Sequence, residues 1–146
     1  AASCLLGCTK SQTEKAGEAG WHAHEGHAEP QSLAEAMTLI KEANGELAAA
    51  YAAGDSGEAD HAFHEIHDAL DAVNKLVETS SMERYDATDA EAAVTSLLTA
   101  LEKVHPPHNG SAIDPATYEG AKADIESAIT ALEGVVNKGA AETAAE

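Results

Sequence analysis

The stretch that decides the fold reads DSGEADHAFHEIHDALDAVNKLV and covers residues 55–77. Its apolar residues recur in alternating steps of four and three, which places them on one face of an α-helix. These residues are Ala59, Phe63, Ile66, Leu70, Val73 and Val77. Asp55 stands before the stripe with Glu58 three residues later, a pattern typical of a helix N-terminus. We therefore predict an amphipathic helix that begins after Asp55.

Three further segments show the same helical spacing of apolar residues. Each begins at a capping signal, and these signals are Ser32 with Glu35, Thr88 with Glu91, and Asp114 followed by Pro115. The first of these helices is expected over Leu33–Ala53. The helix signalled by Thr88 and Glu91 must end before Pro106 and Pro107, because proline cannot continue a helix.

Four helices joined by short loops predict an all-α fold. Short loops make successive helices antiparallel neighbours, so we expect an antiparallel up-down-up-down four-helix bundle over residues 32–138. Residues 139–146 are expected to form a frayed tail. Only 3% of the residues are aromatic, and because alanine dominates the apolar residues, the predicted core is thin.

The charge of the chain excludes several classes of function. The 146 residues include 26 acidic and 8 basic ones, which gives a formal charge of -18. Such a chain gains nothing from the release of counterions by nucleic acid and is not attracted to anionic lipid heads. The sequence also contains no phosphate-binding loop, no Gly-x-Ser-x-Gly and no His-Glu-x-x-His motif. We therefore expect a protein that is not an enzyme and does not bind nucleic acid.

The N-terminal segment has a different character. Residues 9–31 are polar and do not bury enough apolar surface to offset the entropy of ordering, so residues 8–31 are predicted to form a flexible, disordered tether. Leu5-Leu6-Gly7-Cys8 resembles the lipobox of bacterial lipoproteins. The resemblance implies that residues 1–7 are the remnant of a signal peptide, and that the chain is held in the periplasm by a lipid on Cys8. The alternatives are a chance match and a disulfide between Cys4 and Cys8.

The histidines fall into three groups, which are His22, His24 and His27; His61, His64 and His67; and His105 and His108. Within the second group, neighbours lie about 60° around and about 4.5 Å along a helix, close enough for two imidazoles to share a metal ion. A carboxylate follows four residues after each of them: Glu65, Asp68 and Asp71. The pattern fits either a metal-ligand set with supporting carboxylates or a ladder of ion pairs on a solvated face.

Topology relates the three groups to one another. In an up-down bundle the start of the helix at 55–77 and the end of the helix before Pro106 lie at the same end, so His105 and His108 are expected beside the second group. The tether leaves the opposite end. Its His-x-His-x-x-His tract must therefore act alone or fold back along roughly 30 Å of bundle.

Imidazole and carboxylate ligands suit Zn, Cu(II) or Ni. We therefore expect a cell-envelope protein that buffers, stores or delivers a divalent transition metal. Its candidate ligands are His61, His64, His67, Asp68, Asp71, His105, His108, His22, His24 and His27.

Two alternatives stay open. One is a non-catalytic structural or interaction bundle whose acidic surface binds a basic protein partner. The other is a b-type cytochrome-like haem carrier with Met37 and His105 as the axial pair, which the absence of a Cys-x-x-Cys-His motif makes the weaker reading. In any of these cases, Ala-rich helices with few large residues leave room for completion of the core by a homodimer.

Overall fold

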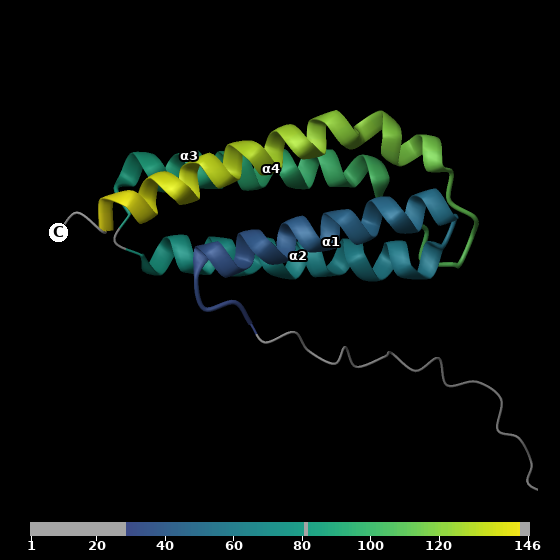
Figure 1. Ribbon diagram of the computed structural model, residues 1–146, viewed down its shortest axis with the longest axis horizontal. Coiled ribbons are helices and arrows are strands. Elements are labelled where there is room, and N and C mark those ends of the chain that lie inside the picture. The colour runs from purple at the N-terminus through teal and green to yellow at the C-terminus, as the bar shows by residue number, and fades with distance from the viewer. Residues whose placement is uncertain (1–28, 81, 144–146) are drawn as a thin grey trace, which may run out of the picture.

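The computed structural model describes residues 29–80 and 82–143, and these residues form an all-helical bundle. The helices are α1 (Leu33–Ala53), α2 (Ser56–Thr79), α3 (Arg84–Leu101) and α4 (Pro115–Thr143), with one 3-10 turn, η1 (Glu102–Val104), after α3. Figure 1 shows the four long helices packed side by side. The prediction of a helical bundle is confirmed, and no strand occurs in the described ranges.

The helices pack as a closed ring of neighbours. α1 lies chiefly against α2 and α3 against α4, while contacts of α1 with α4 and of α2 with α3 complete the ring. In Figure 1 the turn between α1 and α2 and the connection from η1 to α4 lie at the same end of the bundle. The start of α2 and the residues after η1 therefore share that end.

The core lies between the helices and consists of aliphatic side chains and alanines with few aromatic residues. Its largest fully buried side chains include Ile40, Leu47, Ile66, Leu70, Leu97, Leu101, Ile125 and Leu132. Phe63, Tyr51 and Tyr118 are the aromatic members of the buried cluster among the described residues. The apolar stripe of α2 is thus the inner face of that helix, and its other faces are available for a site.

Three of the predicted caps are present. The hydrogen bonds run from the amide of Glu35 to Ser32 Oγ (3.2 Å), from the amide of Glu58 to Asp55 Oδ1 (3.1 Å), and from the amide of Ala116 to Asp114 Oδ1 (2.9 Å). Gly54 ends α1 with a φ of 72°, a left-handed conformation that glycine adopts without a steric cost. These local signals set the ends of α1 and the starts of α2 and α4 where the sequence indicates.

The predicted start of α3 was wrong, and the end of α4 also differs from the prediction. α3 begins at Arg84 and not after Thr88, because an ion pair between the buried Asp86 and Lys138 of α4 adds a turn at its start. Tertiary contact here outweighs the capping box. α4 continues to Thr143, through residues 139–143 that were expected to fray. Alanine in this stretch favours the helical state.

The predicted tether lies largely outside the described residues. Cys8, His22, His24 and His27 all fall in the part of the chain that the structure does not describe. Within the described ranges, no helix has both the length and the apolar character that crossing a membrane requires.

Candidate metal centre

Helix α2 supplies two of the donors, and both lie near its N-terminus. Phe63 and Ile66 belong to the buried stripe of α2 and pack into the core. Asp60 and His64 therefore lie on a face of α2 that is turned away from the core. The side chain of Asp60 is 34% exposed and that of His64 is 47% exposed. Both groups are therefore open to solutes yet fixed by a rigid helix.

A short connection after η1 supplies the third donor. Pro106 is fully buried and fastens the segment His105-Pro106-Pro107-His108 to the bundle. Just before it, the hydroxyl of the buried Tyr51 donates a hydrogen bond to the carbonyl oxygen of Val104 at 2.5 Å. These two attachments hold the connection over α2, where the side chain of His108 is 62% exposed.

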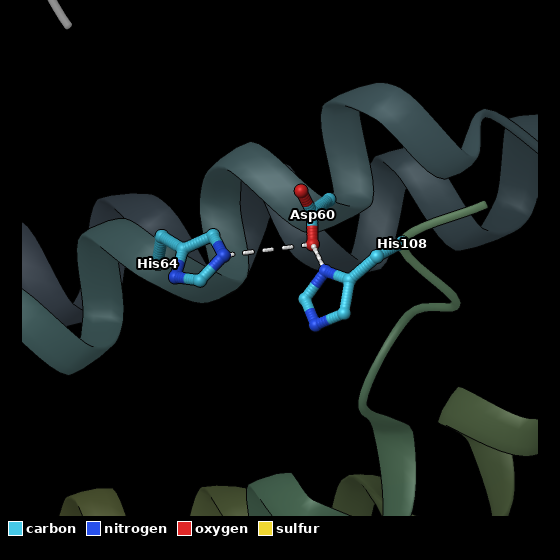
Figure 2. Close-up of side chains that lie close together, drawn as sticks. All are labelled: Asp60, His64 and His108. Carbon is cyan, nitrogen blue, oxygen red and sulfur yellow. Dashed lines mark hydrogen bonds and ion pairs between the residues drawn. The ribbon is translucent and has the colours of Figure 1, made fainter. Parts of the chain in front are cut away.

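Asp60, His64 and His108 form one compact group (Figure 2). One carboxylate oxygen, Asp60 Oδ1, lies 3.1 Å from His108 Nδ1 and 3.6 Å from His64 Nε2. The two imidazole rings are stacked, with their centroids 6.0 Å apart and their planes 18° from parallel. All three donor atoms lie within 4.8 Å of one another. Among the described residues, this is the one group of three such side chains with donors so close together.

The distances suit a single small ion. A four-coordinate Zn²⁺ with bonds of about 2.1 Å holds its ligand atoms about 3.4 Å apart. The separations of 3.1 and 3.6 Å from Asp60 Oδ1 lie on either side of that value. Small side-chain rotations would bring the two nitrogens and the carboxylate oxygen around one ion.

Two more imidazoles surround the same part of α2. The ring centroid of His105 lies 4.6 Å from that of Phe63 and 4.8 Å from that of His108. The ring of His67 packs 4.8 Å from Phe63. The prediction that the second and third histidine groups lie side by side is therefore confirmed.

His67 is held in its neutral form. Burial lowers the pKa of His67 below its ordinary value of 6.5, and positive charge on the nearby His64 acts in the same direction. The carboxylate of Asp71 raises the pKa of His67 but does not cancel the effect of burial. The imidazole of His67 thus serves mainly as a packing group against Phe63.

The remaining predicted ligands on α2 lie apart from the group. His61 pairs with Glu65 at 3.4 Å, as the four-residue spacing predicts, and it borders a shallow groove between α1 and α2. His64 pairs with Asp60, one turn before it, and not with the predicted Asp68. Asp68 and Asp71 are exposed, and neither belongs to the three-residue group.

Asp60 is the site residue that the sequence reasoning missed. Only carboxylates four residues after each histidine were considered, whereas Asp60 precedes His64 by four. The four-residue spacing applies in both directions along a helix, and this was the signal that could have identified Asp60.

The haem pairing of Met37 with His105 does not fit the fold. Met37 precedes Tyr51 by 14 residues in the same helix, which is about 21 Å along the axis. Tyr51 contacts Val104, the residue next to His105. Met37 and His105 therefore lie near opposite ends of α1, too far apart to bind one iron.

The donor set itself indicates the class of ligand. Two imidazole nitrogens and one carboxylate oxygen suit Zn, Cu(II) and Ni better than Mg²⁺ or Ca²⁺, which prefer oxygen ligands throughout. The carboxylates of the chain add a favourable field for any cation, since the formal charge is -18. No protein-family model matches this chain, and no curated protein or solved structure matches it either.

Proposed function

We propose that the protein binds one divalent transition metal ion at Asp60, His64 and His108, and that it buffers, stores or delivers this ion without catalysing a reaction. The observation that carries the proposal is the position of one carboxylate oxygen between two imidazoles from separate segments. An ion-pair ladder along one helix would not require His108, which comes from beyond η1.

The exposure of the donors favours exchange over permanent retention. All three side chains are between 34% and 62% exposed, so an ion can enter and leave without opening the core. Three protein ligands also leave at least one coordination position for a further donor. Such a site fits a protein that takes up an ion and passes it on.

Equilibrium binding of Zn²⁺ to the metal-free chain, in competition with a chromogenic chelator, tests the proposal. The wild type should bind one ion per chain, and His64→Ala and His108→Ala should each weaken binding strongly, because each removes a direct ligand. His61→Ala is the matched control, since His61 lies on the same helix and pairs with Glu65. Equal losses in all three variants, or no binding by the wild type, would refute the site.

Binding should also depend on pH. An imidazole must be free of its proton to bind a metal, so Zn²⁺ affinity should fall as the solution becomes acidic. An affinity that stays constant from pH 8 to about pH 5 would show that imidazoles are not the ligands.

We further propose an up-down-up-down order of the helices and a location in the cell envelope. The shared end of the α1–α2 turn and the η1–α4 connection in Figure 1 supports the first. The lipobox-like Leu5-Leu6-Gly7-Cys8 supports the second, through a lipid on Cys8. Metabolic labelling with palmitate should mark the wild type and leave Cys8→Ser unlabelled, and a labelled Cys8→Ser variant would exclude this attachment.

A further inference from the structure

We infer that His105 rotates to become the fourth protein ligand when the metal binds, and that the closed site then selects a tetrahedral ion such as Zn²⁺. This inference rests on the proposed metal site at Asp60, His64 and His108. It adds that metal binding changes the site from three protein ligands to four.

The ring spacing places His105 within reach. Two imidazoles bound to one ion through bonds of about 2.1 Å have ring centres roughly 5 Å apart. The rings of His105 and His108 are already 4.8 Å apart, with their planes at 83°. The stacked rings of His64 and His108 are 6.0 Å apart. Relative to His108, His105 therefore needs a change of ring orientation more than a change of distance.

The contacts of His105 permit that rotation. Its side chain is exposed, and its ring meets the edge or face of Phe63 without a hydrogen bond from any described residue to its nitrogens. Exposed side chains change rotamer within nanoseconds. The backbone does not need to move, because the buried Pro106 and the hydrogen bond from Tyr51 to Val104 fix it. Rotation thus breaks one ring contact and gains a metal–nitrogen bond.

His67 is the other imidazole near the group, and its surroundings argue against the same role. The ring is half-buried against Phe63, and burial is the main cause of its lowered pKa. Turning this ring toward His64 would remove it from that packing. The exposed His105 is the freer choice.

Three imidazoles and one carboxylate make a four-coordinate site. Zn²⁺ adopts tetrahedral coordination with such ligands, whereas Cu(II) and Ni(II) favour square-planar or tetragonal arrangements. The donors come from a helix and from a loop that crosses it, so they approach an ion from two separate segments of the chain.

Cobalt substitution of the full chain tests the inference, since four-coordinate Co²⁺ absorbs visible light far more strongly than six-coordinate Co²⁺. The wild type should give the intense spectrum. His105→Ala should give a shifted spectrum, because water replaces one imidazole, with one ion still bound and a Zn²⁺ affinity lower by at least the roughly 10- to 100-fold that loss of an outer-shell partner costs. His61→Ala and His67→Ala are the controls and should keep the intense spectrum.

The outcomes separate this inference from the proposed function. Absence of Zn²⁺ binding in the wild type refutes both. One bound ion with an unchanged spectrum and affinity in His105→Ala overturns the role of His105 and leaves the three-residue site intact. Should His105→Ala fail to fold, the ring ¹⁵N resonances of His105 in the wild type decide the matter. They should shift on addition of Zn²⁺, and resonances that stay in place would overturn the inference.

Discussion

Removal of the Tyr51 hydroxyl should destabilise the bundle and loosen the loop that carries His108. The phenol is 2% exposed and donates to the carbonyl oxygen of Val104, itself in a fully buried residue. Burial raises the pKa of Tyr51, so the phenol keeps its proton at neutral pH. Tyr51→Phe leaves the ring in place and deprives a buried carbonyl of a donor. Such a loss costs about 1–3 kcal/mol.

The magnitude can be checked by thermal unfolding followed by far-UV circular dichroism on the metal-free protein. At about 4 °C per kcal/mol for a domain of this size, the midpoint should fall by about 4–12 °C. Tyr118→Phe is the matched control: its ring is equally buried, but its hydroxyl bonds to the half-exposed Asn44, which water can satisfy. Tyr118→Phe should therefore cost less than Tyr51→Phe. Equal losses, or the reverse order, would refute the role given to the hydrogen bond between Tyr51 and Val104.

Four further substitutions test the fold by urea unfolding. Gly54→Ala should destabilise the bundle by about 1–2 kcal/mol, because alanine is strained at a φ of 72°. Gly45→Ala, within α1, should stabilise the bundle by about 0.5–1 kcal/mol. A loss of stability in both variants would contradict the strain explanation. Lys138→Met leaves the buried carboxylate of Asp86 without its cation and should cost about 1–3 kcal/mol, and an unchanged midpoint would refute this. The pKa of His67 is lower in the folded chain than in the unfolded chain, so the unfolded chain binds its proton at a higher pH. Stability is therefore full above about pH 6.5 and falls as the pH drops through the folded-state pKa. His67→Gln should flatten this dependence, and an identical pH profile would exclude His67 as its source.

The helices could be predicted because their signals are local. Leu33–Ala53 matches α1 at both ends, since Ser32 caps its start and Gly54 allows the left-handed end. The start of α3 could not be found in this way. Asp86 and Lys138 are 52 residues apart, and a capping box at Thr88 carries no information on a partner in another helix. Packing between distant segments decided that boundary.

The site could be predicted only in part, for a related reason. Topology predicted that His108 lies near the start of α2, because short loops place the start of α2 and the end of α3 at the same end of the bundle. The choice among His61, His64 and His67 depends on where the loop crosses α2, and that is set by the burial of Pro106. No spacing in the sequence contains that information. Asp60 stands at the same four-residue spacing from His64 as Asp68, and the spacing alone does not choose between them.

Anomalous diffraction at the zinc edge, from crystals of the chain grown with Zn²⁺, tests the metal site most directly. We predict a peak about 2.0–2.2 Å from a carboxylate oxygen of Asp60, from His64 Nε2 and from His108 Nδ1. A peak between His61 and Glu65, or no peak at α2, would contradict the assignment of this group as the metal centre.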